Sequence, residues 1–270
     1  MKIDKLDLPD SAIEFLKSQG FEKLYPPQVD SVKSGLLDGK SILVSAPTAS
    51  GKTLIAMLAM FSYLSKNNGK VVYLSPLRAL AAEKFTEFKK LEKIALGKKI
   101  KVGVSTGDFD GIEKNLEKSD ILILTNEKMD SVIRHGVEWI DEIGLVISDE
   151  VHLIGDENRG PTLEMILTQL KLLDSKPQIV GLSATITNSD EIANWLDCKL
   201  VKNDWRPVPL SEGVCDGGEV TMNDGNIFDV ERSLRGTPID LGVQSVKQGG
   251  QSLVFAETRT RSKSLATKAA

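Results

Sequence analysis

Two short stretches of the sequence contain side chains that could bind and hydrolyse a nucleoside triphosphate. The first joins an apolar run of strand length to one of helix length, the context that a phosphate-binding loop requires. It consists of Ala46, Pro47, Thr48, Ala49, Ser50, Gly51, Lys52 and Thr53. Its backbone N–H groups and the following helix N-terminus would hold the phosphates, which Gly51 lets the backbone approach. Lys52 should reach the β- and γ-phosphates, and the Thr53 hydroxyl should ligate Mg²⁺.

The second stretch is a pair of carboxylates, Asp149 and Glu150, that follows the apolar run Leu145–Ser148. Successive residues at a strand end point in different directions, so one carboxylate can face a metal ion and the other a water molecule. Asp149 would hold Mg²⁺, and Glu150 would orient and deprotonate the attacking water. An Asp-Glu pair alone is usually a solvated turn. After a buried strand, and together with Lys52, it predicts a hydrolytic site.

Alternating strands and helices must position these residues. Apolar runs of strand length occupy Ile42–Ser45, Val71–Ser75, Ile100–Val104, Ile121–Thr125, Leu145–Ser148 and Ile179–Leu182. Helical patterns occupy Ser11–Ser18, the residues after Pro26 and Pro27, Lys52–Leu64, Ala79–Ile94, Glu127–Arg134, Thr162–Leu173 and Asp190–Leu196. This alternation is typical of βαβ units, and the apolar strands indicate burial on both faces. The predicted fold is α/β, with a central mostly parallel sheet flanked by helices.

The pattern changes near residue 200. A stretch rich in proline and glycine, 204–225, predicts a linker that leads into short antiparallel strands. A helix over Pro238–Lys247, a buried strand over Ser252–Phe255 and the start of another helix follow. We therefore expect a first domain over residues 1–200 and the truncated start of a second domain over residues 201–270.

Composition narrows the classes of protein that fit. The 270 residues are 41% hydrophobic and 27% charged, with a net charge of −4, so any nucleic-acid site must be a local patch. The sequence has no apolar run of membrane-spanning length and no signal-peptide pattern, so we expect a cytoplasmic protein without a membrane partner. Cys198 and Cys215 form no metal or redox motif. The lysines of Lys84–Lys101 are interleaved with glutamates, which favours a solvated helix face over a nucleic-acid patch.

Further motifs resemble those of one family. The stretch Asp149–His152 matches the DExH box of superfamily 2 helicases, specifically of the Ski-like group. In these helicases the phosphate loop commonly begins with alanine, as it does here at Ala46. Gln28 matches the motif that reads adenine, which implies selection of ATP over GTP because an amide both donates and accepts at the adenine edge. Phe21 and Tyr25 are alternative aromatic residues for packing on the base.

The resemblance also implies a nucleic-acid track and a set of coupling residues. Three loops match segments of the family that contact the backbone of a single strand. Their residues are Ser75, Pro76 and Arg78, then Thr106 and Gly107 with Asp108, then Thr125 and Lys128. His152, together with Ser183 and Thr185, matches the residues that link the state of ATP to movement along the strand.

Two more stretches, Glu157–Glu164 and Asp204–Leu210, look like those of archaeal DNA-repair helicases within this group. The resemblance spans essentially the whole chain, and it implies a RecA-like first domain followed by the truncated start of a second. It also implies a monomeric DNA helicase that uses ATP and Mg²⁺. Such an enzyme moves 3′ to 5′ on single-stranded or forked DNA, in repair or at stalled forks. Without the second lobe's arginine fingers, we expect this fragment to hydrolyse ATP poorly.

Three alternatives remain open at the level of sequence. One is a non-enzymatic nucleotide-binding module, which would describe the fragment more than the whole protein. An RNA helicase of the same group would use the same motifs, because they contact phosphates and sugars rather than bases. Comparing ATPase stimulation by single-stranded DNA and RNA would distinguish it. A phosphate-loop ATPase without a nucleic-acid partner would keep the nucleotide residues, but all its activities would survive the loss of Arg78 and Lys128.

Overall fold

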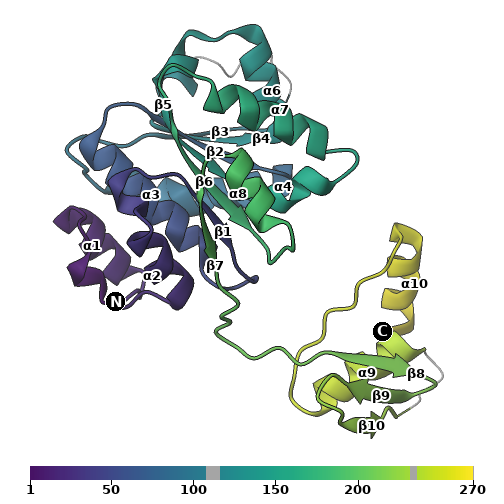
Figure 1. Ribbon diagram of the computed structural model, residues 1–270. Helices are drawn as coiled ribbons and strands as arrows, with labels where there is room; N and C mark the ends of the chain where they lie inside the picture. The colour runs from purple at the N-terminus through teal and green to yellow at the C-terminus, as the bar shows by residue number, and fades with distance from the viewer. Residues whose placement is uncertain (108–115, 232–235, 270) are drawn as a thin grey trace. The chain divides into compact units, whose positions relative to one another are not determined.

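The computed structural model describes residues 1–107, 116–231 and 236–269. The chain divides into two compact units, Met1–Pro207 and Val208–Ala270 (Figure 1). All the nucleotide and nucleic-acid residues predicted from the sequence belong to the first unit. Among the described helices, none combines the length and the apolar character needed to cross a membrane.

A seven-stranded parallel sheet forms the centre of the first unit (Figure 1). Its strands are β1 (Ile42–Ser45), β2 (Lys70–Ser75), β3 (Val102–Ser105), β4 (Ile121–Thr125), β5 (Ile143–Ser148), β6 (Gln178–Ser183) and β7 (Lys199–Lys202). They lie in the order β3-β4-β2-β5-β6-β1-β7, and each neighbouring pair is parallel. The predicted α/β fold is therefore confirmed. The sequence patterns missed β7, because two lysines flank its only apolar residues, Leu200 and Val201.

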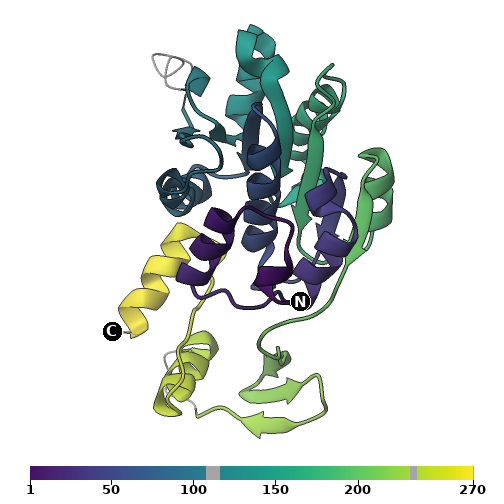
Figure 2. The same ribbon diagram turned by 90° about the vertical axis from the view of Figure 1, so that its left-hand side faces the viewer.

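Helices cover both faces of this sheet (Figure 2). One face packs against α1 (Asp10–Ser18), α2 (Pro26–Lys33), α3 (Lys52–Lys66) and α4 (Arg78–Phe88). The other packs against α6 (Asn126–His135), α7 (Gly160–Lys171) and α8 (Ser189–Trp195). Short 3-10 helices are η1 (Ile3–Lys5), η2 (Leu36–Asp38), η3 (Lys89–Lys93), η4 (Glu138–Glu142) and η5 (Val151–Gly155). Along β1 the side chains alternate between the faces: Ile42 and Val44 enter one core and Leu43 the other, as the two-residue period of a strand requires.

The carboxyl ends of parallel strands share one edge of the sheet, where ligands of open α/β sheets bind. The segments after β1, β5 and β6, three adjacent strands, carry the predicted phosphate, metal and coupling residues, whereas Gln28 lies on α2, before β1. Those after β2, β3 and β4, also adjacent, carry the predicted nucleic-acid track. Since β2 and β5 are neighbours, the two halves of the edge meet between them.

The second unit contains a small antiparallel sheet and two helices. Its strands β8 (Gly213–Asp216), β9 (Glu219–Met222) and β10 (Ile227–Asp229) lie in the order β10-β9-β8, and its helices are α9 (Thr237–Lys247) and α10 (Arg259–Ala269). The domain boundary expected at residue 200 falls inside β7, whereas the first unit extends to Pro207.

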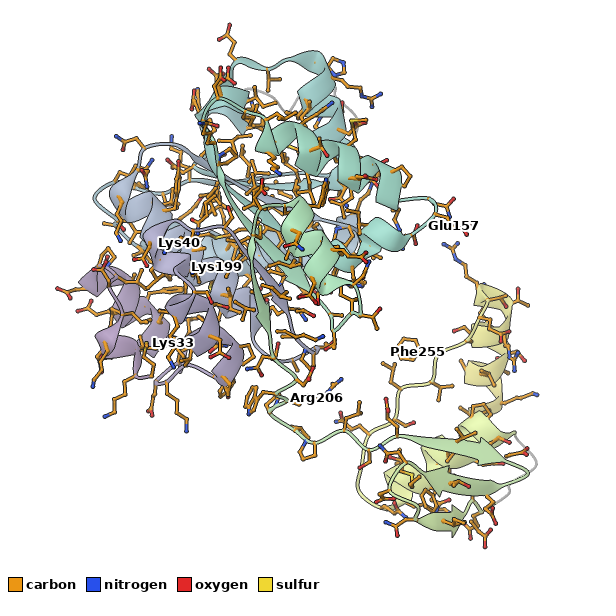
Figure 3. The ribbon with its side chains drawn as sticks, in the orientation of Figure 1. Lys33, Lys40, Glu157, Lys199, Arg206 and Phe255 are labelled. Carbon is orange, nitrogen blue, oxygen red and sulfur yellow. The ribbon has the colours of Figure 1, made fainter. Side chains whose placement is uncertain are left out.

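The prediction of a buried strand over Ser252–Phe255 is wrong. This segment joins no sheet, and Phe255 is 86% exposed (Figure 3). A strand needs a partner for its backbone N–H and C=O groups, and the described part of the second unit has no parallel strand to supply one. The assignment of this unit to a second RecA-like domain stays a prediction.

Candidate nucleotide site and nucleic-acid track

The phosphate loop is held against α2 by Gln28. Gly51 has φ of +86°, a conformation that favours glycine. A Cβ on Gly51 would lie 2.1 Å from Gln28 Nε2. Both the backbone conformation and this close contact therefore disfavour any residue with a side chain at position 51. Gln28 is 1% exposed; its Oε1 accepts from the Tyr25 N–H (2.7 Å), and its Nε2 donates to the Gly51 carbonyl (3.3 Å). An amide has two donors and two lone pairs, so these two bonds leave one donor and one lone pair of Gln28 unused.

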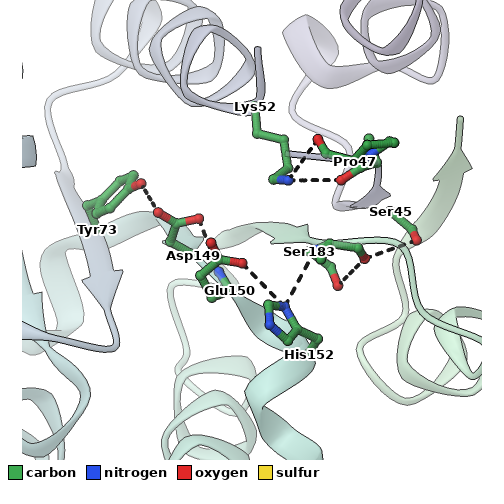
Figure 4. Close-up of polar contacts among 10 residues, drawn as sticks. Ser45, Pro47, Lys52, Tyr73, Asp149, Glu150, His152 and Ser183 are labelled. Atoms are coloured by element: carbon green, nitrogen blue, oxygen red, sulfur yellow. Dashed lines mark hydrogen bonds and ion pairs between the residues drawn. The ribbon is translucent and has the colours of Figure 1, made fainter. Parts of the chain in front are cut away.

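The side chain of Lys52 folds back onto its own loop. Its Nζ donates to the carbonyls of Ala46 (2.8 Å) and Pro47 (3.2 Å), as Figure 4 shows. Burial lowers the pKa of Lys52, and the nearby carboxylates of Glu150 and Asp149 act in the opposite direction. The two predicted stretches therefore lie near each other, although far apart in sequence. A phosphate group bound in the loop would replace the two carbonyls as the partner of this ammonium.

One polar atom of the loop has no partner among the residues that the structure describes. The Oγ of Ser50 is buried without a hydrogen bond. Buried hydroxyls are normally paired, and a phosphate oxygen would supply the missing acceptor. The loop therefore fits a bound phosphate, and the oxygen ligands Thr53 and Asp149 are of the type that Mg²⁺ prefers.

The acidic pair follows β5 as predicted. Asp149 Oδ2 accepts a hydrogen bond from the Tyr73 hydroxyl over 2.6 Å, and Asp149 Oδ1 accepts from the Glu150 N–H over 3.1 Å (Figure 4). Glu150 has φ of +53°, an uncommon conformation for a residue with a side chain. This turn lets the two carboxylates point to different partners. Tyr73, on β2, was missed by the sequence analysis, because a tyrosine in an apolar run is an ordinary core residue.

Lys84 was misinterpreted as part of a solvated helix face. Its side chain is only 12% exposed, and its Nζ donates to the hydroxyl of Thr53 (2.9 Å) and to Glu87 Oε2 (2.9 Å). Lys84 is on α4 and Thr53 begins α3, so the contact joins two elements that the one-dimensional charge pattern could not relate. Lys84 is thus a second lysine, after Lys52, that touches the proposed nucleotide site.

Two of the three predicted coupling residues lie beside the acidic pair. His152 Nδ1 lies 3.3 Å from Glu150 Oε2 and 3.5 Å from the backbone nitrogen of Ala184 (Figure 4). Ser183 Oγ donates to the Ala184 carbonyl over 2.8 Å. One ring nitrogen cannot donate to a carboxylate and accept from an amide at once, so His152 makes one contact or the other. Thr185 is exposed.

Six of the seven predicted track residues line one hollow of about 500 Å³ at the other half of the sheet edge. The lining comprises Pro76, Leu77, Arg78, Thr106, Gly107, Thr125, Glu127, Lys128 and Ser131. Ser75 is excluded, because it is buried and its Oγ donates to the Leu77 carbonyl over 3.3 Å. Asp108 lies outside the described residues.

Within this hollow the exposed cation is Arg78, at the first turn of α4. Thr125 acts instead as the cap of α6, because its Oγ1 accepts from the Lys128 N–H over 3.3 Å. Both Thr125 and Lys128 are nearly buried, at 2% and 4% exposed. Glu127 adds a negative charge to the lining. The hollow is therefore not uniformly basic, and Arg78 with the N-terminus of α4 is its best anion-binding element.

An aromatic pair lies beside Gln28. The rings of Tyr25 and Trp205 are stacked at a tilt, with centroids 4.5 Å apart. Tyr25 is 40% exposed, whereas Phe21 packs against the core. Of the two aromatic residues considered from the sequence, Tyr25 is thus the one placed to meet a base. Trp205 was not predicted as a site residue. Its neighbour Arg206 (Figure 3) is close enough to Lys52 to lower the pKa of that lysine.

The family follows from comparison with known proteins. The family description "DEAD/DEAH box helicase" matches residues 25–192, a span that includes the phosphate loop, the acidic pair and the track. The chain belongs to this helicase family. Curated relatives of this helicase chain include proteins described as the ATP-dependent DNA helicase Hel308. The match is 46% identical in Thermococcus kodakarensis, over 96% of this chain and 22% of that protein.

The Hel308 proteins of Pyrococcus abyssi and Methanocella arvoryzae are 45% and 42% identical, each over 100% of this chain and 36% of the relative. The helicase chain thus spans about a fifth to just over a third of the length of these relatives. Solved structures of the DUF1998 helicase MrfA share its fold. The complex with DNA and AMPPNP has a TM-score of 0.76 at 22% identity, covering 97% of this chain and 38% of that one.

Proposed function

We propose that this chain is the ATP-binding lobe of an ATP-dependent DNA helicase that acts on single-stranded or forked DNA in repair or at stalled forks. One relationship carries the proposal: the phosphate loop, the acidic pair and the track follow adjacent strands along a single edge of the sheet. An ATPase without a nucleic-acid partner would have no need of a track beside its nucleotide site. The relatives described as DNA helicases support DNA over RNA.

In this proposal the chain's own residues bind and orient the reactants. The freed Nζ of Lys52 and the loop N–H groups hold the phosphates. Mg²⁺, held by Thr53 and through water by Asp149, would neutralise the charge that develops on the phosphates. Glu150 would take a proton from the attacking water. Gln28 would contact adenine with its remaining donor and lone pair, while Tyr25 packs on the base.

His152 would couple this chemistry to strand movement. It can contact either Glu150 or the loop of Ser183 and Ala184. Loss of the γ-phosphate would free Glu150 and change which contact is made. That loop follows β6, between the strands of the phosphate loop and of the acidic pair. A two-position side chain at this point is the kind of element that both sites could bias.

Thermal unfolding of the chain with Mg²⁺ and ATP, or with GTP, tests the nucleotide site. A ligand that binds only the native state stabilises it by about 2.7 kcal/mol at a hundredfold excess over its dissociation constant. We expect ATP but not GTP to raise the unfolding temperature, and Lys52→Ala and Gln28→Ala to abolish the effect. A cooperative wild-type transition that ATP does not shift would contradict nucleotide binding by this lobe.

Single-strand binding tests the track. Wild-type chain and Arg78→Ala should be compared on a fluorescent DNA oligonucleotide and on an RNA of the same sequence. We expect measurable binding of DNA that the Arg78 substitution weakens. Tighter binding of RNA would favour the RNA helicase, and equal binding by the two proteins would remove the track from the proposal.

A further inference from the structure

The contact between Lys84 and Thr53 places an ammonium group on a proposed magnesium ligand. The Nζ···Oγ1 distance is 2.9 Å, within the range of a good hydrogen bond. A threonine hydroxyl has one proton and two lone pairs, and the ammonium group uses one lone pair. A metal ion bound to the same oxygen would lie within a few ångströms of this positive charge, where like charges repel strongly.

The contact between Lys84 and Thr53 is partly buried, which distinguishes it from a chance interaction between surface side chains. The side chain of Lys84 is 12% exposed, whereas that of its partner Glu87 is 34% exposed. Helix α4 fixes the start of the Lys84 side chain, since Ala81 and Phe88 of the same helix are fully buried in the core. The lysine therefore reaches Thr53 from a well-anchored helix, across the gap between α4 and α3.

Glu87 offers Lys84 a second position. It lies three residues further along α4, and its carboxylate is 2.9 Å from the ammonium group. The lysine can therefore release Thr53 without losing its counter-charge. Glu83 is a more distant counter-charge, with its Oε1 3.9 Å from the same nitrogen. Lys84 can therefore adopt two positions: one shared between Thr53 and Glu87, and one in which Glu87 is its main partner.

We propose that Lys84 occupies the magnesium position at Thr53 when nucleotide is absent, and that Mg²⁺ must displace it onto Glu87. Lys84 is thus a positioning residue that sets how much Mg²⁺ the site requires. The inference rests on the proposed function, because it needs a nucleotide site that uses Mg²⁺. Helix α4 also connects the two halves of the sheet edge. It begins at Arg78 in the track, and Lys84 follows less than two turns later.

The test measures magnesium affinity without any turnover. A fluorescent, non-hydrolysable ATP analogue is mixed at fixed concentration with the 270-residue chain. Binding is followed by anisotropy while MgCl₂ is added from a chelated start. The variant Lys84→Met keeps an unbranched side chain of similar length and removes the charge. The matched control is Lys90→Met, an exposed lysine of the adjoining η3.

We expect the Mg²⁺ midpoint of Lys84→Met to fall roughly tenfold, the effect of one charge-assisted hydrogen bond that no longer has to be broken. Glu87→Gln should raise the midpoint roughly threefold, because the displaced lysine then lacks its second position. Lys90→Met should match wild type. The opposite signs of the two effects separate this role from a merely structural one, which would shift both variants in the same direction.

An unchanged or higher midpoint in folded Lys84→Met would overturn the proposal. If Lys84→Met does not fold, the proposal is tested by Glu87→Gln instead. A Mg²⁺ midpoint of Glu87→Gln at or below that of wild type would then contradict the proposal. Binding of the analogue by the wild-type chain separates a failure of the proposed function from a failure of the role proposed for Lys84. If the wild-type chain does not bind the analogue at all, both the proposed function and this inference are contradicted. Analogue binding that does not depend on Mg²⁺ contradicts this inference alone. Mg²⁺-dependent binding with unaltered variants removes the role of Lys84 alone.

Discussion

The hydroxyl of Tyr73 lies 2.6 Å from Asp149 Oδ2, and this contact joins the strand before the nucleic-acid track to the carboxylate of the proposed metal site. Tyr73 is on β2, two residues before Ser75, whereas Asp149 follows β5. The backbone makes the same connection, since the Asp149 N–H donates to the Leu74 carbonyl over 3.0 Å. Side chain and main chain together fix the position of Asp149.

Replacement of Tyr73 by phenylalanine should weaken both this positioning and the fold. We expect Tyr73→Phe to lose about 1–2 kcal/mol of unfolding free energy, because a hydrogen bond to a charged acceptor disappears from a buried site. The rise in unfolding temperature caused by Mg²⁺ and ATP should also become smaller. Tyr63→Phe, in the same core, is the control. Equal ligand-induced shifts in the two variants would argue against a role for Tyr73 in the metal site.

Stability should also fall at alkaline pH through Tyr73. Burial, followed by the charge of Asp149, raises the pKa of Tyr73 well above its ordinary value of 10.0. Above pH 10 the unfolded chain loses this proton while the folded chain keeps it, so unfolding free energy decreases as pH rises. The contribution of this one group is about 1.4 kcal/mol per pH unit. Urea unfolding between pH 9 and 11 should therefore show a shallower decline in Tyr73→Phe than in wild type.

Gly51→Ala should be more damaging than an ordinary glycine substitution. The new methyl group would overlap Gln28 Nε2, in addition to the cost of about 1–2 kcal/mol for a left-handed residue with a side chain. Gly39→Ala is the matched control, because φ there is +78° and nothing lies within 4 Å of the added carbon. The double variant Gln28→Ala with Gly51→Ala should recover part of the loss. Equal unfolding temperatures for the two single variants would contradict the close approach.

The two cysteines should react at different rates. Burial raises the pKa of Cys198 to about 12, so only about one molecule in 10⁴ carries the reactive thiolate at pH 8. We expect a chromogenic disulfide reagent to modify Cys215 first and Cys198 only on unfolding. Cys215→Ser should abolish the rapid phase. A rapid phase that persists in this variant would show that Cys198 is accessible.

Arg78 should dominate the salt dependence of single-strand binding. Removing one phosphate contact lowers the slope of log affinity against log salt by about 0.7 for a single strand. We expect Arg78→Ala to show this change on every sequence tested, because a phosphate contact carries no base preference. Arg134→Ala is the control, since that arginine is exposed at the far end of α6 and paired with Asp130. A slope that Arg134→Ala lowers as much would indicate diffuse charge rather than a track.

Local patterns predicted those features that depend on neighbours along the chain. Six of the seven strands of the parallel sheet were predicted, because each combines an apolar run with a motif at its carboxyl end. The phosphate loop and acidic pair were predicted for the same reason. β7 was missed because an edge strand needs few apolar residues: only Val201 among its four residues is buried.

Contacts between elements were beyond sequence patterns. Nothing in the order of charges along α4 and η3 distinguishes Lys84, which touches Thr53, from Lys89, which pairs with Glu92. Only the three-dimensional structure shows which of the two lysines contacts Thr53. The same limit applies to Gln28, whose hydrogen bond to Gly51 depends on how α2 lies against the loop. The predicted strand Ser252–Phe255 has strand-like residues and lacks only a neighbouring strand, which no local pattern can supply.

The order of strands has a consequence for timing. Because β2 and β5 are hydrogen-bonded neighbours, the proposed metal site and the start of the track are separated by a single strand spacing of about 5 Å. The pairing of β2 and β5 is rigid, since strands in a buried parallel sheet cannot slide without breaking the hydrogen bonds between them. In the proposed function, a signal between the nucleotide and the nucleic acid would therefore not require slow motion of a hinge. It can travel as a shift of a few side chains, on the timescale of rotamer exchange.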